Sequence, residues 1–590
     1  MNAILIPRRT KEYTMNRTCA PLLVLLLLCL HITQRVEGAE SKLVKPMADG
    51  SLVMFPWNEQ GDKIPDFSFC GYKNGGVKIP DVPTLVTLEP SGAEDESERI
   101  QTALNELGKN LAKTPGGRGA LLLKKGLWKI NTTLTMSYSG VVLRGEGDGE
   151  DGTVLLAKMK WILIDVKSPQ KDPPWPATPP STRIIDQSYI PVGANRFKIF
   201  KDGDNGYAKV PEKDSLIKNL KPGNEIIILK PKNEAWVKDL GMNIYKFWTA
   251  YALFDRKIVS ISNGELVFDV PLPQSLDEKY GGGVVIPAPP DFRIRECGIE
   301  NLRFDSTYDA SIRTTPKPWE GGEEYASDND HCAFAMSFGK VENAWARNCT
   351  ATHMKHGIVM VGRYARNITV QDCKSLDPVS VIGGGTRYCF LIADLAGPSI
   401  LMQRCYSRNG RHDFLTQGMS VGPNAFVDCS SELAWNCSEN HQKWAMGTLY
   451  DNVRVSGKNG GLCSINRGHW GGSGGPDTSG HGWSGNTTVF WNCAAPLIFA
   501  NQPPLGQNFM IGNSDPKLFD PKWAKGYLSA ANSASGRKDE LVESPFQGSA
   551  WQESPTAMVT PRSLYYAQLQ ARLGKAAVEA VTTNEQRQKH

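Results

Sequence analysis

The chain has 590 residues, more than one compact domain normally holds, and its composition, 40% apolar and 22% charged, is that of a globular protein. Its net charge of +5 includes residues 1–38, which carry five basic residues and two acidic ones, so the remainder has a net charge of +2. A charge this small gives no basis for nucleic-acid binding, and any attraction for an acidic substrate must come from local clustering.

Residues 1–38 have the pattern of a secretory signal peptide. Arg17 precedes the apolar run PLLVLLLLCL, and Val36 and Gly38 occupy the positions before a cleavage point near Gly38. The apolar run is short for a membrane span, although a membrane anchor is the alternative. No second long apolar run follows. We therefore expect an exported protein, secreted or periplasmic, without a membrane span.

The segment after the leader predicts a covering for the end of a larger fold. Residues 39–95 are rich in proline and glycine without a clear period, and we expect them to form an extended N-terminal wrap. Apolar residues then follow helical spacing from Ile100 to Leu111, with Ser97 as the expected cap. A solenoid needs its open end covered, and we assign this helix to that role.

Glycine-broken strands follow the helix and carry a family resemblance. The runs GGRGALLLKKGLWKI and SGVVLRGEG resemble the start of the pectate-lyase-like superfamily of right-handed parallel β-helix proteins, and RNCTATH and VQDCKSLD fit the same superfamily. The resemblance covers about residues 90–515 and implies both the fold and a carbohydrate substrate. It does not fix the reaction, because the superfamily includes lyases, hydrolases and epimerases.

Residues 160–290 depart from the spacing of the coil and predict a strand-rich insertion. The runs NRFKIF, NEIIILK and IVSISNGELVFDV are typical of strands. Between them, residues 233–250 could form a lid or a groove wall. Their aromatic residues, from Trp236 to Trp248, could stack on sugar rings or pack the insertion onto the coil.

A short phrase recurs between residues 341 and 493: a turn, an alternating apolar strand and a small residue near its end. These small residues lie 24, 32, 24, 28 and 36 residues apart and are Cys349, Cys373, Cys405, Cys429, Gly457 and Cys493. Strands that repeat every 20–50 residues indicate a parallel β-helix. We expect the five cysteines to form a column of buried thiols, whereas Cys437 with Cys463, or Cys389 with a neighbour, could form disulfides.

The predicted fold is thus an all-β, right-handed parallel β-helix over residues 96–515 that contains the insertion. A capping helix precedes the coil. A C-terminal extension, residues 516–590, follows it and includes a helix over residues 563–581, because SLYYAQLQARLGKAAVEAV has a helical pattern.

Polar side chains that could act in catalysis gather on successive turns of this coil. Six of the nine histidines lie between His353 and His481. Equivalent side chains one turn apart are separated by about 4.8 Å in such a coil, so these residues can share a site. The candidate catalytic residues are His412, His441, Arg411, Asp413 and Lys443. The candidate substrate-binding residues are Arg387, Glu439, Trp444, Arg467, His469, Trp470, His481 and Trp483.

β-Elimination from a uronate-containing polysaccharide suits this set best. The reaction needs a base for the proton next to the carboxylate and cations that neutralise the carboxylate. His412 or His441 is the expected base, and Arg411, Lys443 and Arg467 are expected to bind the carboxylate. The tryptophans of the set would form a sugar platform. The sequence therefore predicts a polysaccharide lyase.

Two other functions remain open. A glycoside hydrolase would need two carboxyl groups about 5–9.5 Å apart, and Asp413 with Glu439, or Asp394, are the candidates. A GHG motif at residues 480–482 also occurs in polygalacturonases, but their paired-aspartate motif is absent. The third function is a non-catalytic glycan-binding solenoid.

We expect no metal or other cofactor. The acidic turns near Glu146 and Asp202 could bind Ca²⁺, but no specific calcium-binding motif supports such a site. The oligomeric state stays open.

Overall fold

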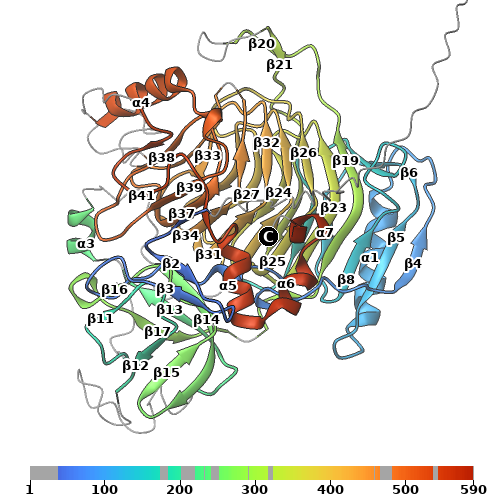
Figure 1. Cartoon of the computed structure of the whole chain (residues 1–590). Coiled ribbons are helices and arrows are strands. Elements are labelled where there is room, and N and C mark those ends of the chain that lie inside the picture. The colour runs from blue at the N-terminus through green and yellow to red at the C-terminus, as the bar shows by residue number, and fades with distance from the viewer. Residues whose placement is uncertain are drawn as a thin grey trace, which may run out of the picture. The chain divides into compact units, whose positions relative to one another are not determined.

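The structure is a computed structural model that describes residues 38–172, 184–200, 220–231, 233–240, 252–289, 291–316, 323–457, 459–465, 481–535 and 543–588. The predicted signal peptide therefore lies, except for Gly38, outside the described residues. The described strands pair in parallel from rung to rung and form a parallel β-helix (Figure 1). This confirms the predicted fold class.

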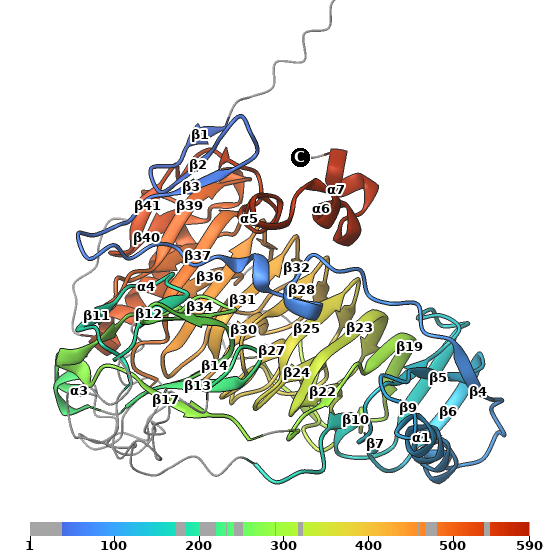
Figure 2. The ribbon, with the colours of Figure 1, turned by 90° about the horizontal axis from the view of Figure 1, so that it is seen from below.

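One wall of the coil is a ten-stranded sheet to which successive rungs contribute one strand each. Its order is β40-β38-β36-β33-β30-β27-β24-β22-β10-β7, and these strands follow one another along the coil (Figure 2). The bounds are β7 (Leu134–Met136), β10 (Trp161–Lys167), β22 (Cys332–Gly339), β24 (Gly357–Val361), β27 (Tyr388–Ile392), β30 (His412–Thr416), β33 (Cys437–Asn440), β36 (Gly461–Ser464), β38 (Ile498–Ala500) and β40 (Phe546–Gln547).

The other walls belong to a second large sheet whose strands also pair rung by rung. Its strands are β4 (Thr84–Leu88), β5 (Gly119–Leu123), β6 (Gly126–Ile130), β8 (Val141–Arg144), β9 (Thr153–Ala157), β18 (Ile294–Arg295), β19 (Gly298–Ser306), β23 (Val341–Thr352), β25 (Arg366–Gln371), β26 (Lys374–Leu376), β28 (Ile400–Gln403), β29 (Tyr406–Arg408), β31 (Val421–Val427), β32 (Ser430–Glu432), β34 (Ala445–Asp451), β35 (Arg454–Val455), β37 (Gly485–Cys493), β39 (Phe509–Asn513) and β41 (Trp551–Glu553). A small hairpin, β20 (Arg313–Thr314) with β21 (Tyr325–Ala326), projects from the loop after β19.

The interior of the coil is filled by columns of like side chains. Phe414, Phe426, Tyr450 and Phe490 have ring centroids 5.0–5.8 Å apart, and all four are buried. Stacked rings in a dry interior contribute beyond the apolar area that they bury. Each rung therefore stabilises its neighbours.

The cysteine column is present and is buried. The position between Cys429 and Cys493 is occupied by Val453, not Gly457, because Arg454 pairs with Ser430 and with Ala494. Gly457 instead lies in the turn after β35, at φ +135°. Cys389, Cys437 and Cys463, named above for possible disulfides, are buried thiols.

The N-terminal end of the coil is covered by α1 (Ser97–Leu111). Its buried face includes Ile100, Leu104 and Leu107, as the helical spacing predicts. The predicted cap is wrong by one residue, because Ser97 is the first helical residue and Glu96 occupies the cap position. Asp95 accepts hydrogen bonds from the backbone nitrogen and hydroxyl of Ser97.

Residues 39–82, which we call the strap, run along the coil from its last rungs to its first (Figure 2). β1 (Ala39–Glu40) pairs with β42 (Val559–Thr560) near the C-terminal rungs. Toward its other end, the Tyr72 ring lies 5.4 Å from the Trp345 ring. The chain then continues to β4. The strap also contains β2 (Val44–Pro46), β3 (Leu52–Met54) and the short 3₁₀ turns η1 (Phe67–Phe69) and η2 (Tyr72–Asn74).

The insertion forms a separate antiparallel sheet with the order β12-β15-β14-β13-β17. Its elements are β11 (Tyr189–Ile190), β12 (Arg196–Lys198), β13 (Glu225–Lys230), α3 (Glu234–Asp239), β14 (Ala252–Ser262), β15 (Glu265–Phe268), β16 (Leu276–Asp277), η4 (Glu278–Tyr280) and β17 (Val284–Pro287). β10, which lies inside the predicted insertion range, belongs to the coil. The insertion packs on the coil through one apolar cluster that includes Trp236, Phe254 and Trp444.

The C-terminal extension contains more helix than the sequence predicts. The predicted helix is interrupted at Gly574, whose φ of +81° separates α5 (Leu564–Leu573) from α6 (Lys575–Val581), and α7 (Asn584–Gln588) follows. The extension also contains η5 (Pro516–Leu518) and α4 (Pro521–Ser535), which the sequence analysis does not predict. Within the described residues, no helix is both long and apolar enough to cross a membrane.

Candidate functional site

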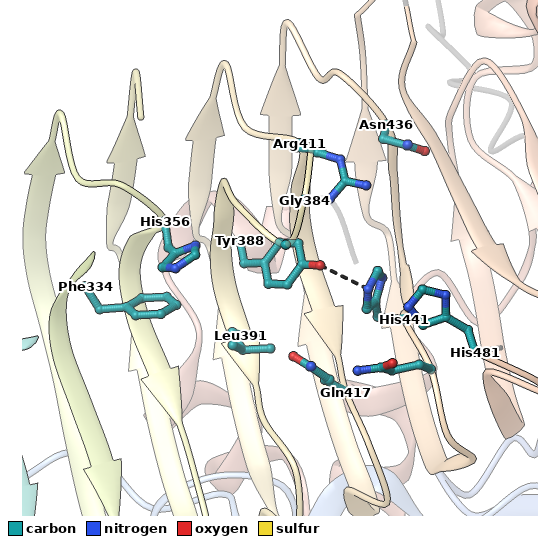
Figure 3. Close-up of a pocket in the computed structure, with 12 residues that line it drawn as sticks. Phe334, His356, Gly384, Tyr388, Leu391, Arg411, Gln417, Asn436, His441 and His481 are labelled. Carbon is teal, nitrogen blue, oxygen red and sulfur yellow. Dashed lines mark hydrogen bonds between the residues drawn. The ribbon is translucent and has the colours of Figure 1, made fainter. Parts of the chain in front are cut away.

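A cavity of about 710 Å³ opens on the outer face of the ten-stranded sheet. Figure 3 shows its lining side chains, which come from successive rungs of the coil. The lining residues are Phe334, His356, Gly384, Gly385, Tyr388, Leu391, Arg411, Gln417, Asn436, His441, Gln442 and His481.

A chain of hydrogen bonds runs from this cavity into the protein. The Tyr388 hydroxyl lies 3.0 Å from Nε2 of His441 (Figure 3). Nδ1 of His441 in turn lies 2.5 Å from Oε1 of Glu439. An ionised carboxylate only accepts hydrogen bonds, so Nδ1 of His441 carries a proton and Nε2 can accept one from Tyr388. We call these three side chains the relay.

The register of the sheet assembles the relay. Tyr388 pairs with His412 in the next strand, and the strand after that carries Glu439 opposite Leu415. His441 follows directly after that strand, so two rungs of the coil bring it beside a tyrosine 53 residues earlier in the chain.

Glu439 is buried and is held through both of its carboxylate oxygens. Its Oε1 also lies 3.2 Å from Nδ1 of His412, and its Oε2 accepts a hydrogen bond from Sγ of Cys463 at 3.2 Å. His412, Glu439 and His441 offer ligand atoms within 4.8 Å of one another, so this group could hold a metal ion. In the structure Oε1 of Glu439 is engaged with Nδ1 of His441 and Nδ1 of His412.

The cavity end nearest His441 is positively charged. Burial, together with His481, Arg411 and Lys443, lowers the pKa of His441 well below its usual value, so the imidazole is neutral near pH 7. Among the described residues that line the cavity there is no aspartate or glutamate. A bound anion would therefore meet Arg411 without repulsion from a neighbouring carboxylate.

His412 and Asp413 do not reach the cavity. His412 is fully buried, and its Nδ1 lies 2.6 Å from the carbonyl oxygen of Cys437. Asp413 is also fully buried and accepts a hydrogen bond from the Ser407 hydroxyl at 2.5 Å. The structure therefore contradicts the expectation that either side chain touches a substrate. Asp413 faces away from the cavity because adjacent residues of β30 point to opposite sides of the sheet.

Trp444 and Arg387 are structural rather than substrate-binding. Trp444 is completely buried under the insertion, where its Nε1 donates to Oε1 of Gln274 at 2.9 Å and its ring meets Trp236. Arg387 is 3% exposed and donates to the carbonyl oxygen of Ser380. Neither side chain can stack on or bind a sugar in this arrangement.

The remaining candidates divide between the cavity and its surroundings. Arg411, His441 and His481 line it, and Glu439 lies directly behind His441. Lys443 is not a lining residue but is close enough to influence His441. Trp483 is half-buried and donates from Nε1 to the carbonyl oxygen of Leu240 in the insertion. Arg467, His469 and Trp470 lie outside the described residues, as do the insertion aromatics Tyr245, Phe247 and Trp248.

Sequence reasoning does not predict Tyr388 or Phe334, and it includes His356 in the histidine cluster without naming it as a site residue. A signal for Tyr388 exists, because it lies 24 residues before His412, which is the commonest rung length in the repeat. Phe334 and His356 lie in the two rungs before Tyr388, and Phe334 is an apolar strand residue that no sequence signal separates from the packing residues.

The acidic turn near Glu146 is explained by protein contacts. Glu146 accepts hydrogen bonds from Nζ of Lys124 and the backbone nitrogen of Lys125, and Asp148 accepts one from the Thr350 hydroxyl. The other acidic turn, near Asp202, lies outside the described residues.

No protein-family model matches the sequence, and no curated protein is similar to it. Solved structures give weak matches. ORF18 of Geobacillus virus E2 is 9% identical over 72% of this chain and 57% of its own (TM-score 0.33). The tailspike protein gp49 of Pseudomonas phage LKA1 is 10% identical over 71% of this chain and 57% of its own (TM-score 0.34). An iota-carrageenase bound to iota-carrageenan fragments is 10% identical over 77% of this chain and 64% of its own (TM-score 0.28). The match thus spans less than two thirds of each of these chains, and likeness at this level does not identify the reaction.

Proposed function

We propose that the chain is an exported polysaccharide lyase that cleaves a uronate-containing glycan by β-elimination. The observation that carries the proposal is the relay, a tyrosine, a histidine and a glutamate in one hydrogen-bonded row, which opens into a cavity lined by Arg411. The row supplies a base, and the arginine supplies the positive charge that a uronate needs.

In the proposed mechanism Tyr388 is the group that meets the sugar. Its hydroxyl passes a proton to Nε2 of His441, and the phenolate removes the proton on the carbon next to the carboxylate. Glu439 stabilises the imidazolium through Nδ1, as a buried carboxylate does in a catalytic triad. Arg411 binds the carboxylate, whose charge rises as the proton leaves.

The electrons of the broken C–H bond then form a carbon–carbon double bond, and the glycosidic C–O bond breaks. The leaving oxygen takes up a proton, which His441 returns through Tyr388. The relay thus ends in its initial protonation state, and the products are a new non-reducing end with a double bond and an intact reducing end.

The geometry favours elimination over hydrolysis. A hydrolase needs two carboxyl groups on either side of the bond that it cleaves. Asp413 faces away from the cavity, Glu439 is covered by His441, and no described lining residue carries a carboxyl group. The hydrolase hypothesis with Asp413 and Glu439 therefore has no pair that a glycosidic bond could reach.

Digestion of a panel of uronate-containing and neutral polysaccharides tests the proposal. We expect new ultraviolet absorbance, which marks the double bond, with at least one uronate polymer and with no neutral one. His441→Ala should lower kcat by about 10²–10⁴-fold, the usual contribution of a proton-transfer group.

The matched control is His353→Ala, because His353 does not line the cavity and its Nδ1 pairs with Asp305 on the other sheet. It should keep wild-type activity. New reducing ends without ultraviolet absorbance would show hydrolysis and contradict the proposal.

A further inference from the structure

The cavity has two ends of different character. Arg411, His441 and His481 lie at one end, and Phe334 and His356 lie at the other, with Tyr388 between them (Figure 3). The Phe334 and His356 rings stack with centroids 4.9 Å apart and planes inclined by 24°. The His356 ring lies 6.0 Å from that of Tyr388. The second end therefore continues the row of rings beyond the relay.

This second end is apolar and carries no charge among its described lining residues. Phe334 packs in one buried cluster with Tyr388, Leu391 and Leu415. Burial, with smaller effects from Lys355 and His331, lowers the pKa of His356 to about 3, so the imidazole is neutral throughout the physiological range.

His356 has an unsatisfied polar atom. Its Nδ1 is buried, and it has no hydrogen-bond partner among the described residues. Leaving a buried polar atom without a partner costs about 1–3 kcal/mol. A ligand hydroxyl that enters this end of the cavity, or a water molecule that it carries with it, can supply the missing bond after a small rotation of the ring.

A carboxylate would be disfavoured at the same place. It would lose its hydration against Phe334 and Leu391, and the described residues that line this end of the cavity include no cation. A neutral sugar has the opposite properties, since its C–H face can cover an aromatic ring while its hydroxyls form hydrogen bonds.

We propose that Phe334 and His356 form a neutral-sugar subsite next to the uronate subsite at Arg411, so that the preferred substrate is a mixed glycan in which uronate and neutral sugars are linked. This inference rests on the proposed lyase function for the identity of the uronate end. His356 precedes β24 and Arg411 precedes β30, two rungs later, so the two subsites are separated by roughly 10 Å. Different sugar residues of one chain can occupy them.

Binding to an inactivated enzyme tests the inference separately from catalysis. The protein is the full chain with Tyr388→Phe, and the probes are oligosaccharides of equal length, one of galacturonate alone and others in which each galacturonate or glucuronate is followed by two neutral residues of rhamnose, glucose or xylose. Calorimetry should show at least one mixed probe binding about tenfold more tightly than the uronate-only probe.

Adding His356→Ala should remove this tenfold preference and leave the affinity for the uronate-only probe unchanged. Phe334→Leu is the second variant, which keeps an apolar side chain in place if His356→Ala fails to fold, and His353→Ala is the matched control. Equal affinity of the parent for all probes, or an equal loss for every probe in the variants, would overturn the subsite. If the proposed lyase function were wrong, the wild-type protein would produce no ultraviolet absorbance, while the binding preference of the Tyr388→Phe protein would remain.

Discussion

Glu439 is the residue on which the relay depends, because its carboxylate contacts both His412 and His441. We expect Glu439→Gln to lower kcat by about 10²–10⁴-fold, because a neutral amide cannot stabilise the imidazolium. Substrate binding should change little, since Glu439 does not line the cavity. Steady-state kinetics on the active polymer measure both parameters.

The control for this substitution is Glu432→Gln. Glu432 is exposed and accepts a hydrogen bond from Tyr406 on the other sheet. If the two variants had the same kcat, the role assigned to Glu439 would be wrong.

Asp413 and Asp451 predict how stability depends on pH. Burial raises the pKa of Asp413 to about 6 and that of Asp451 to about 7, from a usual value of 3.8. Both groups bind protons more tightly in the folded chain, so the free energy of unfolding should fall as pH rises from about 4 to about 7. For Asp413 alone, the difference between its raised pKa and the usual value corresponds to a loss of roughly 3 kcal/mol in the free energy of unfolding.

Asp413→Asn should therefore raise the melting temperature by several degrees at pH 8 and change it little at pH 4. Asp49→Asn is the control, since Asp49 is exposed and its hydrogen bond with Ser51 lowers its pKa. Differential scanning calorimetry at the two pH values measures these melting temperatures. An Asp413→Asn variant that melts below the wild type at pH 8 would contradict the raised pKa of Asp413. The same substitution should leave kcat unchanged.

At the residue scale, the repeat predicts which rungs contribute to the site but not which side chains face it. His441, Arg411 and His481 could be placed near one another from the repeat spacing. Asp413 could not be separated from them, because a shift of one residue along a strand moves a side chain to the opposite face. His412 lies on the same face as Tyr388, and its burial beside the rings of Tyr388 and His441 is not visible in the sequence. Tyr388 was overlooked because a neutral tyrosine in a strand is most often a packing residue.

The insertion is fixed to the coil by buried ion pairs. Arg366 of β25 lies 3.1 Å from Oδ1 of Asp255 and 2.8 Å from Oδ2 of Asp269, both in the insertion, and its side chain is 1% exposed. Arg293, where the chain returns from the insertion to the coil, also pairs with Asp255 and lies 3.0 Å from Glu225 of β13. Two buried arginines thus share the carboxylates of one sheet.

Arg366→Met should destabilise the protein by about 3–5 kcal/mol, because it leaves buried carboxylates without a partner. Arg196→Met is the control within the same insertion. Arg196 pairs with Glu265 at 3.3 Å, and both side chains are exposed, so its loss should cost no more than about 1 kcal/mol. Chemical denaturation measures both, and similar losses would show that the ion-pair cluster does not fix the insertion.

At the element scale, periodicity predicts α1, the rungs and the strand-rich insertion. It does not reveal what an insertion covers, and Trp444 was assigned to a sugar platform because its cover, Trp236, is 208 residues away in the chain. α4 was missed although Asp520 accepts hydrogen bonds from the backbone nitrogens of Lys522 and Trp523 at its start. Its sequence contains glycine and several serines, which weaken a helical pattern.

For the whole molecule, the strap closes an apolar face of the coil. Phe67 is fully buried, and it belongs to one cluster with Leu401, Val427 and Trp491 of the coil and Leu569 of α5. The backbone nitrogen of Phe67 also donates to Oε1 of Gln568 at 2.8 Å. The strap therefore joins coil and C-terminal helices into one cooperative unit.

Phe67→Ala should lower the free energy of unfolding by about 3–5 kcal/mol through the cavity that it leaves. Phe55→Ala, in the same strap, is the control, because Phe55 is 41% exposed and should cost less than about 1 kcal/mol. Chemical denaturation followed by circular dichroism measures both. Equal stability of the two variants would mean that the strap is not part of the folded unit.

The relay is tested most directly by one comparison of tyrosines. Tyr388→Phe removes a single oxygen atom from the cavity, and Tyr406→Phe removes one from the hydrogen bond to Glu432 on the other sheet. The measurement is the rate of ultraviolet absorbance increase on the polymer that the wild type cleaves. We predict a loss of at least about 100-fold for Tyr388→Phe and a wild-type rate for Tyr406→Phe. A wild-type rate for Tyr388→Phe would contradict the mechanism.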